Sequence, residues 1–337
     1  MRPLARVVWS TMRPPVVLLL VLYAACGAAA GGAAGTAAPG SALLVVLPFL
    51  AYSAVVNDLA DEHIDRVNLP EDARRVLAAG AAHRRQLWAV ALGAGALTLA
   101  AAAWLGALAL AVAGTGLLVS TAYSLGPVRL ATRGVIAPLV LPACYVAVPY
   151  LLGLLASGAG VRASDLPLLA ALYVGFIGRI ILKDFRDLRG DALFGKRTFL
   201  VRHGRAWTCH VSATCWAAGA GLLLWARPGG SPAYVLATLA GTALAMTLLH
   251  ELAGPRARHR QQDWLISALA IVGRGLVLVL AVDLAAPAAR WPSALTSAVI
   301  AALAVSVGGQ ALRMRRHGPS RGRPPVVGRR QGLSRVG

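Results

Sequence analysis

The chain has 337 residues, of which 58% are hydrophobic and only 14% are charged, whereas a soluble domain of this length carries about 25% charged residues. The basic residues that give its net charge of +20 lie mostly in loops and in the C-terminal tail, so we expect anionic lipid headgroups and substrate phosphates as partners, and no nucleic acid. The four cysteines lie in or beside apolar segments without forming a CxxC pair, which predicts free thiols and no zinc site.

Hydrophobic runs near twenty residues long follow one another along the whole chain. A helix of about twenty residues crosses the hydrocarbon core of a bilayer, and a helix satisfies its own backbone hydrogen bonds there. The runs therefore predict an all-α polytopic membrane helix bundle with nine to ten transmembrane helices, since the short alternating blocks typical of an outer-membrane barrel are missing. The predicted spans are 15–35, 41–57, 86–104, 106–124, 135–155, 166–183, 207–226, 232–250, 264–286 and 292–312.

The first span follows Arg2, Arg6 and Arg13, as the apolar part of a signal peptide would. We expect it to be retained, because nine further apolar segments come after it. With a cytoplasmic N-terminus, the cytoplasmic segments hold 28 of the 33 Lys and Arg residues and the opposite side holds three. This asymmetry favours ten spans over nine. It predicts a single transmembrane domain over 1–312 and a basic, disordered cytoplasmic tail over 313–337.

Two arginines, Arg179 and Arg274, lie inside predicted spans. Charges in hydrocarbon are costly and usually have a partner or reach the interface. We expect Arg274 either to meet a buried carboxylate such as Asp283 or to extend toward the membrane surface.

The acidic residues form two clusters with the same spacing. The first is Asp58, Asp61 and Asp65 and the second is Asp184, Asp187 and Asp191. Positions i, i+3 and i+7 share one face of a helix, and each cluster begins at the cytoplasmic end of a predicted span. Two such faces across a bundle would place up to six carboxylates in one cavity, where hard oxygen ligands suit Mg²⁺. The pair of clusters predicts a metal-assisted diphosphate site, with two solvated acidic helix ends as the alternative.

These residues resemble known motifs. Residues 57–65 (NDLADEHID) resemble the NDxxDxxxD motif of the UbiA superfamily of intramembrane prenyltransferases, and residues 184–198 resemble its second DxxDxxxD motif with the basic turn that follows. Between them, residues 123–130 (YSLGPVRL) resemble the YSxPPxRLK loop. Residues 68–80 resemble the stretch after the first motif. Two positions depart from the loop pattern, since Gly126 replaces its first proline and Ala131 its lysine.

The resemblance implies a ring of helices around a central cavity that opens laterally to lipid. It implies Mg²⁺ as the cofactor, with a metal-binding set that contains the expected catalytic residues Asp58, Asp61, Asp184 and Asp187. The full set of implied metal ligands is Asn57, Asp58, Asp61, Asp65, Asp184, Asp187 and Asp191. The residues expected to bind substrate are Asn57, Tyr123, Arg129, Lys183, Lys196 and Arg197.

The expected activity is the transfer of a polyprenyl group from its diphosphate to an aromatic or other lipophilic acceptor, in the plasma membrane and with the site facing the cytoplasm. A terpene cyclase of UbiA type is the closest alternative, because it would form the same allylic cation. A cation-binding membrane transporter is the alternative from another class, although transporters tend to place charges near the bilayer midplane on broken helices.

Overall fold

The chain folds into a bundle of membrane-length helices. The computed structural model describes residues 8–9, 11–33, 36–68, 77, 80, 82–254 and 259–319. Within them, nine helices are long and apolar enough to cross a membrane, and the chain is a multi-pass membrane protein. These are α3 (Ala38–Ala60), α5 (Arg84–Leu105), α6 (Ala107–Ser124), α7 to α8 (Ile136–Ala156), α9 (Leu166–Ile180) with its flanking turns, α11 (Phe199–Ala226), α12 (Pro232–Ala253), α13 (His259–Ala285) and α14 (Ser293–His317).

The first predicted span corresponds to a shorter apolar helix, α2 (Pro14–Ala30), of 17 residues. Every predicted span thus coincides with a helix, and the all-α polytopic fold class is confirmed. Helix α14 continues to His317, past the predicted end of the membrane domain. Residues 320–337 of the predicted tail and most of the stretch after the first acidic motif lie outside the described residues.

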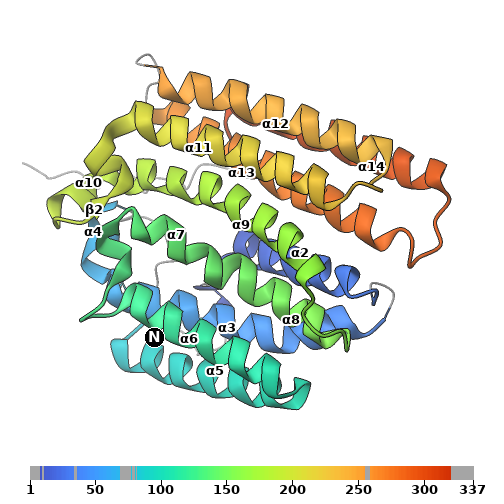
Figure 1. The fold of residues 1–337 in the computed structure, drawn as a ribbon. Coiled ribbons are helices and arrows are strands. Elements are labelled where there is room, and N and C mark those ends of the chain that lie inside the picture. Colours follow the sequence, from blue (N-terminus) through green and yellow to red (C-terminus); the bar gives the residue numbers. More distant parts are fainter. Residues whose placement is uncertain are drawn as a thin grey trace, which may run out of the picture.

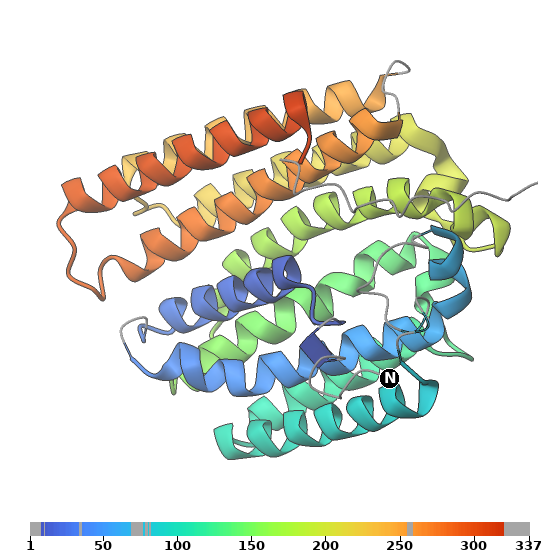
Figure 2. The same cartoon turned by 180° about the vertical axis from the view of Figure 1, so that it is seen from behind.

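The helices form three layers (Figures 1 and 2). Helices α11 to α14 form one outer layer, and α3, α5 and α6 form the other. Helices α2, α8 (Val148–Ala156) and α9 lie between them, where α2 contacts α8, α13 and α3. The central layer is therefore covered by protein on both faces.

Small residues allow the close helix contacts of this bundle. A side chain at Gly27 of α2 would clash with the backbone of Tyr150, and one at Gly153 of α8 would clash with the backbone of Ala24. In hydrocarbon there is no hydrophobic force between helices, so close packing of backbones becomes the main source of association. The glycines at these two positions have this structural reason.

Two of the membrane-spanning segments are irregular. The α7 (Ile136–Pro142) to α8 segment contains a π-helical turn at Ala143–Ala147. Helix α9 passes through a 3₁₀ turn, Ile181–Lys183, into α10 (Asp184–Leu193). The π-helical turn lies within its span, whereas the 3₁₀ turn lies at the end of the bundle where the second motif begins.

The partners of Asp283 differ from the pairing with Arg274 considered from the sequence. Its carboxylate accepts a hydrogen bond from Arg227 at 2.7 Å and another from the backbone N–H of Ser231 at 3.0 Å. It does not pair with Arg274, which was one of the two alternatives expected for that arginine, because the loop between α11 and α12 already supplies both partners. The pair ties that loop to the end of α13.

Candidate active site

A cavity of about 430 Å³ lies at the end of the bundle where the two acidic motifs come together. Figure 1 shows α4 (Glu62–Asn68) and α10 side by side at this end, and the two helices are in contact. The predicted residues on its wall are Asn57, Asp61, Asp65, Tyr123, Lys183, Asp187, Asp191 and Lys196. The structure therefore brings most of both motifs to one space.

The first motif crosses a helix break. Asp61 stands between α3 and α4 with φ −104° and ψ 15°, but its N–H still donates to Asn57 O at 2.9 Å. The N–H of Asp65 likewise donates to Asp61 O at 2.8 Å. The helical ladder thus continues through the break, which keeps Asn57, Asp61 and Asp65 on the cavity side, and Asn57 Nδ2 donates to Asp61 Oδ2 at 3.1 Å.

The second motif belongs to α10. Asp187 and Asp191 line the main cavity, and the Asp191 side chain is only 1% exposed. Asp184 lines a small side cavity that shares Tyr123, Lys183 and Lys196 with the main one. Four of the six expected carboxylates therefore line the main cavity, and Asp184 lies beside it.

Asp58, the sixth carboxylate, is buried and has a partner that the sequence did not reveal. Arg13 Nη2 donates to Asp58 Oδ1 at 2.7 Å, and Arg13 itself lines the cavity. Arg13 adopts the left-handed conformation, with φ 50°, just before α2. In the sequence it resembles an ordinary cytoplasmic charge before a first span, so only the fold shows that it turns inward.

Three of the predicted substrate-binding cations lie among the carboxylates. Arg129 Nη2 donates to Asp61 Oδ1 at 3.0 Å and to Ala60 O at 3.1 Å. Lys196 Nζ lies 3.7 Å from Asp61 Oδ2 and 3.4 Å from Asp191 Oδ1, so it bridges the two motifs. Lys183 Nζ lies over the ring of Tyr123, 5.9 Å from its centroid.

The loops that carry these cations are paired. Strand β1 (Arg133–Gly134) runs parallel to β2 (Arg197–Thr198), with Arg133 opposite Arg197. This short ladder fixes the YSLGPVRL loop against the turn after the second motif. Arg197 is exposed and does not line the cavity, unlike its neighbour Lys196.

Burial and neighbouring charges shift the pKa values of the ionisable groups at the membrane edge. Burial raises the pKa of Asp191 to about 6 against the opposing effect of Lys196. Burial alone would also raise the pKa of Asp61, but Lys196 and Arg129 lower it below its usual value. The pKa of Lys196 is raised, because the attraction of Asp61 and Asp191 outweighs its burial. Lys196 therefore links the titration of Asp61 to that of Asp191.

The donor set fits a hard divalent cation. Both carboxylate oxygens of Asp191 are buried without accepting a hydrogen bond from any described residue, although Lys196 lies near as an ion-pair partner. The surrounding groups are carboxylates and the Asn57 amide, which are the oxygen ligands that Mg²⁺ takes. Over the described residues, no three acidic, His or Cys side chains are yet close enough to hold an ion. A metal ion held there would take the place of the Arg and Lys side chains that pair with these carboxylates in this structure.

The chain is similar to several known proteins. The profile of the UbiA prenyltransferase family matches residues 17–272. Among curated proteins, the chain is 30% identical over 182 residues to the bacteriochlorophyll synthase 33 kDa chain of Cereibacter sphaeroides, covering 52% of this chain and 59% of that protein. It is 30% identical over 171 residues to the chloroplastic chlorophyll synthase of Oryza sativa, covering 47% and 44%. The matched region thus spans about half the length of these relatives.

The fold is shared with solved structures of low sequence identity. A UbiA homologue of Archaeoglobus fulgidus bound to GPP and Mg²⁺ superposes with a TM-score of 0.62 at 18% identity, covering 90% of this chain and 99% of that one. A digeranylgeranylglyceryl phosphate synthase gives a TM-score of 0.62 at 17% identity, covering 83% and 98%. With the family profile matched over most of its length, the chain belongs to the UbiA prenyltransferase family.

Proposed function

We propose that the chain transfers a polyprenyl group from its diphosphate to an aromatic or other lipophilic acceptor, with Mg²⁺ as cofactor. The observation that carries the proposal is the single cavity that receives both acidic motifs together with Lys183 and Lys196. Carboxylates alone would repel a diphosphate, and cations alone would not explain the four acids on the wall. A polyanion that arrives with a divalent cation suits both sets of charges.

The residues of the chain divide into two tasks. Asn57, Asp61, Asp65, Asp187 and Asp191 would hold Mg²⁺, with Asp58 and Asp184 close behind them. When bound, Mg²⁺ would neutralise the charge that develops on the diphosphate as the carbon–oxygen bond breaks.

The cations would bind the phosphate oxygens. Lys183 and Lys196 line the cavity, and Arg129 reaches its edge through Asp61. Preorganised charges of this kind stabilise a leaving group without reorganisation. Once the metal binds the carboxylates, the Lys and Arg side chains that had paired with them would be free to bind the phosphate oxygens.

Part of the remaining wall is apolar and suits the prenyl chain, beside the polar side chains of Ser53, Ser120, Ser124 and Arg186. Val16, Leu141, Ile180 and Tyr145 contribute to the apolar part. Apolar walls exclude water, which would otherwise capture an allylic cation. The ring of Tyr145 stacks on Phe176 at 5.7 Å, so its position in the wall is fixed.

The acceptor is proposed from the relatives. Two of the similar curated proteins are named as bacteriochlorophyll and chlorophyll synthases. We therefore include a chlorophyll-type ring acceptor beside a simple aromatic one. The cytoplasmic side of the plasma membrane is proposed for the site because the basic residues gather at the end that carries both motifs.

An assay with purified protein tests the proposal. Prenyl diphosphates of several chain lengths are supplied with and without each acceptor, and products are identified by mass spectrometry. We expect diphosphate release that depends on Mg²⁺ and a prenylated acceptor. A cyclic hydrocarbon formed without acceptor would identify a terpene cyclase instead. If no substrate releases diphosphate and the protein conducts cations in proteoliposomes, the chain is a transporter and the proposal is wrong.

A further inference from the structure

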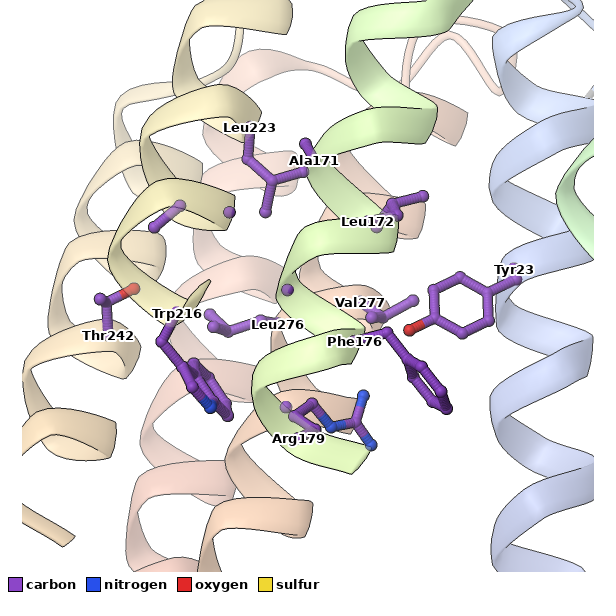
Figure 3. Close-up of a pocket in the computed structure, with 14 residues that line it drawn as sticks. Tyr23, Ala171, Leu172, Phe176, Arg179, Trp216, Leu223, Thr242, Leu276 and Val277 are labelled. Atoms are coloured by element: carbon purple, nitrogen blue, oxygen red, sulfur yellow. The ribbon is translucent and has the colours of Figure 1, made fainter. Parts of the chain in front are cut away.

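A second pocket lies within the bundle, apart from the cavity of the acidic motifs. It is a space of about 40 Å³ between α9, α11 and α13, with Tyr23 of α2 at one side. Its wall is apolar except for Arg179, Trp216, Thr242 and the Tyr23 hydroxyl (Figure 3). The rings of Phe176 and Tyr145, which stack on each other, separate it from the larger cavity, since Phe176 lines one space and Tyr145 the other.

Arg179 has a charge that the described residues do not neutralise. Its Nε and Nη1 atoms are buried and have no hydrogen-bond partner, and none of the ion pairs among the described residues involves it. The Tyr23 hydroxyl lies within hydrogen-bonding reach of the guanidinium, and the Phe176 ring lies 5.7 Å from its Cζ atom, but neither group supplies a carboxylate counter-charge. Arg274 of α13 is the nearby charge, and it repels Arg179.

The guanidinium is directed into the membrane. Side chains on a helix tilt toward its N-terminus, and the N-terminus of α9 lies at the end of the bundle opposite the acidic motifs. Arg179 accordingly lines the pocket with Gly175 and Phe176, which precede it on α9. Gly273 of α13 makes the room, because a side chain at that position would clash with Arg179 Nε. The position is therefore built into the fold.

The free hydrogen-bonding groups of the pocket are donors. Trp216 Nε1 is also buried without a partner among the described residues, and its ring packs on Gly178, next to Arg179. Arginine and the indole of tryptophan donate and do not accept. The hydroxyl of Thr242 already donates to Thr238 O at 2.7 Å. A ligand that satisfies this pocket must bring acceptor oxygens and negative charge.

The size of the pocket selects among anions. A water molecule needs about 10–15 Å³ of such space, so the pocket holds a group of roughly three heavy atoms. A carboxylate fits, whereas a glycerophosphate or diphosphate does not. We propose that the pocket between α9, α11 and α13 binds the carboxylate of a long-chain lipophilic acid, with Arg179 and Trp216 as its donors. This site is independent of the prenyl transfer proposed above.

Titration of the purified full-length chain with oleate, followed by native mass spectrometry, tests the site. We expect one saturable oleate adduct. Methyl oleate, which lacks the charge, and dioleoyl phosphatidic acid, whose headgroup is larger, should fail to displace it. Displacement by methyl oleate would show binding without the guanidinium, and displacement by phosphatidic acid would show a phosphate site. Either result overturns the proposal.

Variants locate the adduct. Arg179→Gln removes the charge and should weaken oleate binding at least tenfold, whereas Arg179→Lys should retain part of it. Arg313→Gln, the same change at an exposed residue of α14, is the matched control. Removing an unpaired buried charge does not strain the apo bundle, so the Gln variant should stay folded by size-exclusion chromatography.

A second change keeps the charge and blocks its position. Gly273→Ala should displace the guanidinium and also weaken the adduct. Equal oleate binding by wild type and Arg179→Gln would refute the site. The adduct should persist in excess EDTA and in Asp187→Asn, which separates its outcome from that of the diphosphate cavity.

Discussion

At the residue scale, the acidic motifs are held by cations of the chain itself. Lys196 bridges Asp61 and Asp191, Arg129 binds Asp61, and Arg13 binds Asp58. The sequence predicted the carboxylates from motif spacing, and Lys196 from the resemblance to the family's second motif. It could not predict Arg13, because a left-handed turn before α2 is what directs that side chain inward.

The first prediction concerns the carboxylates on the cavity wall. Asp61→Asn and Asp187→Asn keep the side-chain size but remove the charge. If these groups hold Mg²⁺ against the leaving diphosphate, each change should lower turnover by roughly 10² or more. Asp165→Asn, at a carboxylate that lies before α9 at the opposite end of the bundle, should leave turnover unchanged.

The double variant makes this test stricter. Asp61→Asn with Asp187→Asn should lose far less than the product of the single losses, because groups that act as one unit are not additive. Full activity in excess EDTA, or wild-type turnover in folded Asp187→Asn, would contradict a metal-dependent diphosphate site.

The second prediction concerns Arg13. Arg13→Ala leaves the buried Asp58 without that cation and should destabilise the unloaded protein by about 1–3 kcal/mol, less than a fully buried pair because Arg13 is partly exposed. Added Mg²⁺ should reduce the difference in Tm if metal takes over Asp58. Arg66→Ala, which removes an exposed pair with Glu62, is the control. An equal loss of Tm with and without Mg²⁺ would leave Arg13 a structural partner only.

At the element scale, the close approach of α9 and α11 positions the second motif. A Cβ at Gly219 would lie 2.9 Å from Gly175 Cα, so the two backbones are nearly in contact there. Helix α9 leads directly into α10, and a shift of α9 would move Asp187 and Asp191. Close packing of α11 is therefore a condition for the geometry of the site.

The third prediction compares two glycines of α11. Gly219→Ala must separate the helices, which typically costs about 1–3 kcal/mol. Gly221→Ala meets no atom within 4 Å and gains the same helix propensity. We expect a lower Tm and weaker diphosphate binding for Gly219→Ala alone. Indistinguishable unfolding curves would show that the contact is not tight in solution.

The sequence predicted these helices but not their irregularities. Hydrophobic length is sufficient to place each span, because lipid requires a helix wherever an apolar run is long enough. The break at Asp61, the π-helical turn at Ala143–Ala147 and the β1–β2 ladder depend on neighbours distant in sequence. A local pattern carries no information about such partners.

At the scale of the whole molecule, the basic residues and the acidic motifs gather at the same end of the bundle. The ends of α12 and α14 are joined by Arg315 and Glu251, whose side chains form a hydrogen bond of 2.9 Å. The acidic motifs lie at the same end as the basic loops. The cytoplasmic orientation itself is a prediction from the distribution of Lys and Arg.

The fourth prediction tests that orientation. A reporter fused after Arg316 should report a cytoplasmic location, because ten crossings return the chain to the side of its N-terminus. A matched fusion in the loop at Arg227 should report the opposite side. An external signal after Arg316 would mean that α2 does not cross the membrane.

The bridge that Lys196 makes between Asp61 and Asp191 has a consequence for the order of loading. A divalent cation entering alone must displace an ammonium that then has no counter-charge, and a diphosphate entering alone meets four acids. In the proposed function each ligand would remove the obstacle to the other, so their affinities would be coupled, and by thermodynamic reciprocity each would raise the other's affinity by the same factor. We expect the empty cavity to bind the divalent cation alone or the diphosphate alone only weakly, and to bind the two together in one step.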